Sequence, residues 1–242
     1  MWLHKWFISL AMVVFWILTI SSCAFPSPMF DSRVRPVVSD ETLLSGEPCL
    51  PPCWYDIVPG STGTAAALEK IRLLEFVNPT SVERTNRDLY PGTDDSIDWK
   101  YQGTNDYGGD IFIADDTVKW IRISHPNHLI LEEVTATIGE PDWIWAGRAG
   151  GAGNHHIYRF VYEEMGLMLE SRMYGDNSPM PENVIVSSDI EIDEAFYFAP
   201  RTLAQYLTDI QWVSEDQLEN IKNAYQEWSG FGSEIATAQY SP

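Results

Sequence analysis

Residues 109–124, GDIFIADDTVKWIRIS, contain the clearest structural signal in the chain. Isoleucines recur at every second position on both sides of the sequence Ala-Asp-Asp-Thr at 114–117. A period of two predicts β-strands with one buried face, because successive side chains of a strand point to opposite sides. The polar residues between the two runs are typical of a tight hairpin turn. We therefore expect two adjacent antiparallel strands.

The residues before this hairpin predict a helix and a further strand. Ser61 and Thr62 precede an alanine-rich stretch with apolar residues on one face, which is typical of a capped amphipathic helix. Asn-Pro at 78–79 then turns the chain, and SIDWKYQ at 96–102 continues it as a strand. This part of the chain is therefore expected to be a helix followed by an antiparallel meander.

A similar order recurs about 62 residues later, which indicates an internal repeat. LILEEVTATIG at 129–139 predicts a helix, and Pro141 turns the chain as Pro79 does. HHIYRFVYEE at 155–164 and GLMLESR at 166–172 predict a hairpin. We therefore expect two pseudo-repeats of one helix-plus-meander unit.

The C-terminal part is expected to close the fold with helices. Further strand is predicted at 190–198, and two helices follow it. Ser214 begins the last helix with the spacing of a capping box, and Gly230 or Gly232 is expected to end it. The predicted fold class is therefore α+β, with two pseudo-repeats of helix and antiparallel β-meander closed by C-terminal helices.

The N-terminus has the composition of an export signal. Lys5 lies in a short basic region, and residues 6–20 carry no charge. This run is shorter than the roughly 20 residues of a typical membrane span. The sequence Ile-Ser-Ser-Cys at 20–23 follows it and resembles the lipobox of bacterial lipoproteins, in which Leu is commoner than Ile at the first position. An ordinary secretory signal and an uncleaved anchor are the alternatives.

The lipoprotein resemblance implies that Cys23 carries a membrane anchor. In that family the lipobox thiol becomes a diacylglyceryl thioether on the first residue of the mature chain, and two acyl chains anchor a protein stably. The resemblance thus implies an extracytoplasmic protein held on the bacterial cell membrane. Prolines are frequent in the residues that follow, which are expected to form a flexible tether.

The expected divisions of the chain follow from these patterns. They are a signal peptide at 1–22, a lipidated flexible tether at 23–48, the first repeat at 49–124, the second repeat with extra strands at 125–198, the C-terminal helices at 199–232 and a disordered tail at 233–242.

Cys49 and Cys53 are the two cysteines that remain. In an exported protein an even pair favours a disulfide. A redox motif would more usually be Cys-x-x-Cys, and a zinc site needs two further ligands near by. We therefore predict a disulfide that fixes the start of the folded domain.

The composition excludes one class of partner. The chain of 242 residues is 45% hydrophobic, enough to bury a core. It contains 15 Lys and Arg residues and 35 Asp and Glu residues, and this excess of negative charge repels nucleic acid. We expect no nucleic-acid binding, and we interpret the acidity as a means of solubility rather than an acidic recognition site.

The repeat pattern resembles the tandem helix-plus-meander folds of the β-lactamase-inhibitor protein and of BamE-type assembly lipoproteins. The resemblance rests on Ile-Gly-Glu-Pro-Asp at 138–142 and on Tyr162 followed by Gly-Leu-Met-Leu at 166–169. PCWYDIVPGST at 52–62 also resembles the PCWxGIxPGxT opening of uncharacterised bacterial lipoproteins, from which Tyr-Asp at 55–56 departs. These short motifs imply an architecture rather than an activity.

Residues that could support catalysis lack the spacing that catalysis needs. The histidines outside the export signal do not form a metal-binding helix motif and are interpreted as turn and strand residues. They are His125, His128, His155 and His156. The glycine-rich stretch 147–154 joins two strands, whereas a phosphate-binding loop opens a helix. The aspartates of TDDSID at 93–98 lack the calcium-loop pattern and are expected in a solvated loop. We expect no catalytic residue, metal or cofactor.

The aromatic residues of the second repeat are the candidate binding surface. Trp143 and Trp145 alternate, as do Tyr158 and Phe160, so each pair points to one face of its strand. Such stripes are most often core. If the helices leave one sheet face open, these residues would contact a protein or a glycan, and in the β-lactamase-inhibitor resemblance it is the sheet that meets the partner. The sequence therefore favours a binding or envelope-structural role, with an envelope enzyme such as a hydrolase, or a glycan- or solute-binding lipoprotein, as alternatives.

Overall fold

The computed structural model describes most of the chain beyond residue 41. The described residues are 42–86, 92–104, 106–124, 129–148, 155–174, 181–209 and 213–238. The chain divides into two compact units, residues 1–35 and 36–242, and every described residue belongs to the second.

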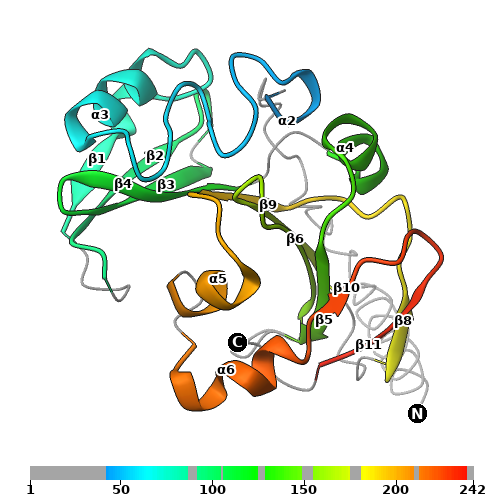
Figure 1. Cartoon of the computed structure of the whole chain (residues 1–242). Helices are drawn as coiled ribbons and strands as arrows, with labels where there is room; N and C mark the ends of the chain where they lie inside the picture. Colours follow the sequence, from blue (N-terminus) through cyan, green and yellow to red (C-terminus); the bar gives the residue numbers. More distant parts are fainter. Residues whose placement is uncertain are drawn as a thin grey trace, which may run out of the picture. The chain divides into compact units, whose positions relative to one another are not determined.

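One antiparallel sheet of nine strands organises this unit (Figure 1). In spatial order the strands are β1 (Glu83–Thr85), β2 (Asp95–Lys100), β3 (Tyr107–Ala114), β4 (Thr117–Ser124), β9 (Glu194–Phe198), β7 (Leu167–Tyr174), β6 (His155–Tyr162), β5 (Trp143–Arg148) and β10 (Gln226–Glu227). Two further strands, β8 (Asn183–Ile185) and β11 (Glu234–Ala236), form a separate pair. The α+β class expected from the sequence is confirmed, because helices flank this sheet.

The described helices are short. They are α2 (Thr42–Ser45), α3 (Thr64–Leu73), the 3₁₀ turn η1 (Pro79–Ser81), α4 (Leu131–Ile138), α5 (Leu203–Asp209) and α6 (Glu215–Lys222). Helix α3 precedes the meander β1 to β4, and α4 precedes β5 to β7. The strand β9, expected as an extension of the second repeat, instead lies between β4 and β7, where it joins the two meanders into one sheet.

Each face of the sheet has its own hydrophobic core. Ala67 and Ile71 of α3, Val134 of α4 and Ile111 of β3 belong to one cluster of buried residues on one face. On the other face, α5 and α6 cover a second cluster (Figure 1). This cluster contains Phe112, Trp120, Trp145, Met168, Phe196 and Tyr206. Because the strands alternate, adjacent residues serve opposite cores, and the charged residues described below share the face of the second.

The hairpin predicted at 109–124 is present. β3 pairs with β4, and the turn between them holds Asp115 at φ 50° and Asp116 at φ 56°. Two left-handed residues in a two-residue loop are typical of a type I′ turn, whose twist matches that of the strands. The hairpin of β6 and β7 through Gly166 is present too.

Three expected boundaries are wrong. The tether was expected to reach residue 48, but α2 begins at Thr42, and Leu43 is buried in the first core. The last helix ends at Lys222, not at Gly230 or Gly232, because the residues after it pair with β5 as β10. The tail was expected to be disordered from residue 233, but β11 pairs with β8 and buries Ile235. Tertiary pairing, which local patterns do not encode, explains the two C-terminal differences.

Candidate functional site

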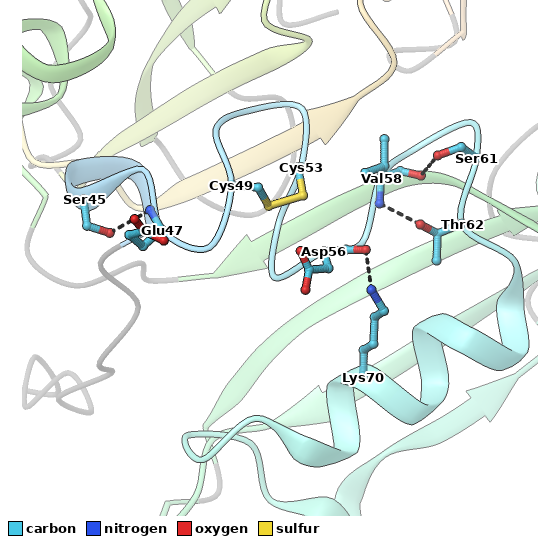
Figure 2. The surroundings of a disulfide bond; sticks show 9 residues. All are labelled: Ser45, Glu47, Cys49, Cys53, Asp56, Val58, Ser61, Thr62 and Lys70. Atoms are coloured by element: carbon cyan, nitrogen blue, oxygen red, sulfur yellow. Dashed lines mark hydrogen bonds between the residues drawn. A yellow bond between two sulfur atoms is a disulfide. The ribbon is translucent and has the colours of Figure 1, made fainter.

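The start of the folded unit is clamped by a disulfide. Cys49 and Cys53 are bonded, with their Cα atoms 5.7 Å apart, as predicted (Figure 2). The two sulfurs and a carboxylate oxygen of Asp56 lie within 4.8 Å of one another. Since both sulfurs are in the disulfide, they are not thiolates, the form in which cysteine binds a metal. We interpret the group as a structural staple.

The residues after the disulfide hold this segment on the sheet. Trp54 is fully buried, and its ring stacks on that of Trp99 with centroids 5.5 Å apart. Trp54 and Ile57 exchange backbone hydrogen bonds around a two-residue turn. In Figure 2, Lys70 of α3 reaches the turn, where its Nζ donates to the carbonyl oxygen of Asp56 at 2.7 Å. Residues 54–57 thus connect the segment that contains the disulfide to both α3 and the sheet.

Replacing Asp56 with glycine is expected to stabilise the protein by about 0.5–1 kcal/mol. Tyr55 and Asp56 adopt φ values of 47° and 60°, a type I′ conformation in which glycine is strongly preferred at the second position. The Asp56 side chain is exposed, and the hydrogen bond from Lys70 goes to the backbone carbonyl oxygen of residue 56, so glycine would keep it. Urea unfolding measures the change. Asp56→Ala is the control and should not stabilise, because it keeps a Cβ; equal gains for both variants would contradict the turn argument.

A row of charged side chains crosses the face of the sheet that α5 covers. It runs over strands β2, β3, β4, β9, β7 and β6 and consists of Asp98, Asp110, Arg122, Glu194, Arg172, Glu170 and Arg159. We call these residues the charged row. Asp110 is 0% exposed and Glu170 is 2% exposed, so the row is not a solvated surface. Buried charges of this kind require partners.

Arginines join the carboxylates of the row. Arg122 Nε donates to Asp110 Oδ2 at 2.7 Å. Glu170 accepts from two arginines, Arg159 Nε at 2.9 Å and Arg172 Nε at 2.6 Å. Arg172 Nη2 also contacts Glu194 Oε2 at 2.8 Å. Arg172 thus bridges two carboxylates that lie directly opposite each other on β7 and β9.

The carboxyl groups of the row differ in proton affinity. Burial raises the pKa of Asp110 to about 7, against the attraction of Arg122, and a hydrogen bond with Asp98 raises it further. Burial and the negative charge of Glu170 raise the pKa of Glu194. Burial alone would raise the pKa of Glu170 as well, but Arg159 and Arg172 reverse the direction and lower it. The row therefore contains carboxyls that hold a proton near neutrality beside one that stays ionised.

Arg159 lies at the deep end of the row. Its guanidinium is 5.2 Å from the ring centre of Trp145, and Tyr206 and Tyr225 lie near it. Tyr225 is buried, and its hydroxyl interacts with both Arg159 and Tyr206. Arg159 is therefore held by its ion pair with Glu170, its cation–π contact with Trp145 and the neighbouring tyrosine hydroxyls.

The four aromatic candidates do not form one exposed surface. Trp145, Tyr158 and Phe160 are buried, and only Trp143 of the four is partly exposed. Trp145 belongs to the core to which α5 contributes, whereas Tyr158 and Phe160 belong to the core on the opposite face, to which α3 and α4 contribute. Residues paired across β5 and β6 share a face, and Trp145 pairs with Arg159, so the tyrosine and phenylalanine point the other way.

The other candidate residues are only partly described. Cys23, His125, His128 and the glycine-rich residues 149–154 lie outside the described residues. His156 Nε2 is buried, and none of the described residues forms a hydrogen bond with it.

The aspartates at 93–98 were expected in a solvated loop, which is wrong for most of them, because β2 begins at Asp95. Asp98 belongs to the charged row, and Asp95 forms an ion pair with Arg84 of β1. Asp94 Oδ2 accepts from the backbone N–H of Asp115, and Asp98 Oδ1 accepts from the Ser96 hydroxyl, so these aspartates have protein partners rather than water alone.

Among the described residues, no helix is long and apolar enough to span a membrane. Comparison with protein-family models, curated proteins and solved structures finds no match to this chain.

Proposed function

We propose that this chain is an extracytoplasmic lipoprotein, anchored to the bacterial cell membrane through Cys23, with a binding or envelope-structural role. The observation that carries the proposal is the Cys49–Cys53 disulfide. Disulfides form and persist in oxidising, extracytoplasmic compartments. Pairing these two cysteines leaves Cys23, at the lipobox-like position, as the one cysteine without a disulfide partner in the sequence.

We propose further that the two helix-plus-meander units are structural repeats. In each unit a helix precedes the strands of the meander. The last strand of the first meander, β4, and the last strand of the second, β7, both pair with β9. The two meanders are thus placed symmetrically about one central strand. This arrangement supports the resemblance to tandem helix-plus-meander proteins, among which it is the β-lactamase-inhibitor resemblance that implies a sheet surface in contact with a partner.

A binding role accounts for the described contacts better than hydrolysis. The charged row is the three-dimensional polar cluster that an enzyme would need, but its buried carboxylates Asp110, Glu170 and Glu194 pair with arginines. A nucleophile, a base and an orienting acid within hydrogen-bond reach would be expected of a hydrolase. A protein or glycan partner would use side chains such as the partly exposed Trp143.

Replacing Cys23 with serine is expected to abolish lipid attachment, because the thioether requires the sulfur atom. Cells expressing either form are labelled with a fatty-acid analogue, and the label on the purified chain is measured. The control is Cys49→Ser with Cys53→Ser, which removes the two sulfur atoms of the disulfide but keeps Cys23 and should retain the label. Label on the Cys23→Ser variant equal to that on the unaltered chain would refute the anchor.

A further inference from the structure

The charged row contains two pairs of carboxyl groups that face each other across neighbouring strands. Asp98 of β2 lies directly opposite Asp110 of β3, and Glu170 of β7 lies directly opposite Glu194 of β9. Like charges in directly opposed positions destabilise a sheet. Three of these four side chains, those of Asp110, Glu170 and Glu194, are buried, which strengthens the repulsion, since the interior screens charge poorly.

The hydrogen bonds of the first pair show where a proton would bind. Asp110 Oδ2 accepts from Arg122, but Asp110 Oδ1 is buried without a donor among the described residues. Asp98 Oδ1 accepts from the hydroxyl of Ser96 at 2.9 Å. A proton on Asp110 would make its carboxyl a donor to Asp98 and replace a repulsion by a hydrogen bond.

The second pair shares one arginine. Arg172 contacts both Glu170 and Glu194, and Glu170 has a second arginine in Arg159. Glu170, which contacts two arginines, therefore remains ionised. Glu194 contacts Arg172 and has the raised pKa, so Glu194 is the carboxyl of this pair that takes up a proton. Arg122 and Asp110 are the other charged groups that act on Glu194, and they oppose each other.

We propose that these two opposed carboxyl pairs, Asp98 with Asp110 and Glu170 with Glu194, are proton-binding sites that make the fold more stable in mild acid than at alkaline pH. The sites lie on either side of the β4–β9 contact, where the two meanders join, so proton loss weakens the centre of the sheet. The inference concerns the folded unit and does not depend on the lipid anchor.

The direction of the effect follows from linkage. A carboxyl whose pKa is higher in the folded chain than in the unfolded chain binds more protons when folded, so acidification favours the folded state. For Asp110 the stabilisation builds up as the pH falls through about 7 and is complete near the ordinary value of 3.8. Glu194 contributes in the same direction.

Urea unfolding of the full chain in a non-ionic detergent tests the proposal, with tryptophan fluorescence as the signal. The urea midpoint is expected to be higher by about 1 M at about pH 5.5 than at about pH 8. Asp110→Asn and Glu194→Gln, which mimic the protonated carboxyls, should each reduce this difference, and together they should remove most of it. Glu69→Gln on α3, where the side chain is exposed, is the matched control and should leave it unchanged.

A second measurement needs no variant. Unfolding the unaltered chain in weakly buffered urea at about pH 6 is expected to release about two protons per molecule, which a pH indicator detects. Net proton uptake, or a midpoint that does not depend on pH, would overturn the proposal. A double variant that keeps the full pH dependence would overturn it as well.

Discussion

Replacing Glu170 with alanine is expected to lower the free energy of unfolding by about 3–5 kcal/mol. The Glu170 carboxylate is 2% exposed and accepts ionic hydrogen bonds from Arg159 and Arg172. Arg172 keeps a second carboxylate in Glu194, but Arg159, which is also buried, has Glu170 as its one ion-pair partner among the described residues. The cost is large because the substitution leaves a guanidinium in the interior without its counter-ion. Urea unfolding of the full chain at neutral pH measures it.

Two matched variants separate this cause from a simple loss of contacts. Asp209→Ala removes an ion pair with Arg201 whose carboxylate is half exposed, and should cost less than about 1 kcal/mol. Glu170→Leu combined with Arg159→Met removes both charges of the buried pair and should be less damaging than Glu170→Ala alone. If Glu170→Ala lowers the free energy of unfolding by no more than Asp209→Ala does, the charged row does not need Glu170 for its stability.

The charged row could not be predicted from the sequence, although each member carries a recognisable signal. Asp110 and Arg122 each stand in a strand between buried residues two positions away on both sides, and Glu170 follows the buried Met168 at the same spacing. A polar residue at such a position indicates a buried partner, but it does not say which strand provides the partner. That depends on the order of the strands, and the pairing of β9 with both β4 and β7 is not encoded locally. Hence the contact between Arg172 and Glu194 appears only in three dimensions.

The local features of the fold were predictable because short-range chemistry determines them. The Asp115–Asp116 turn follows from two alternating strands around a two-residue polar loop. The Cys49–Cys53 disulfide follows from the even number of cysteines that remain once Cys23 is set aside. The strand β10 was not predictable, because Gln226 and Glu227 have little strand propensity and pair only with the free edge of β5.

Replacing Gly166 with alanine is expected to lower the free energy of unfolding by about 4 kcal/mol or to prevent folding. Gly166 has φ 57° in the turn between β6 and β7, and a Cβ built there would lie 1.9 Å from the carbonyl oxygen of Phe198. The obstacle is backbone, which cannot rotate away as a side chain can. The same turn is fixed in place because Phe198 donates its backbone N–H to the Gly166 carbonyl at 2.8 Å. Relief of the overlap would therefore pull the turn away from the end of β9.

Gly103→Ala is the matched control for the left-handed backbone conformation. Gly103 has φ 78°, but no atom of the described residues lies within 4 Å of the Cβ that alanine would add. Its replacement should therefore cost only the conformational strain of about 1–2 kcal/mol. The difference between the two variants, measured by urea unfolding, isolates the contact with Phe198. Equal losses would mean that the turn moves freely, and the β6–β7 hairpin would then not be held against β9 at this point.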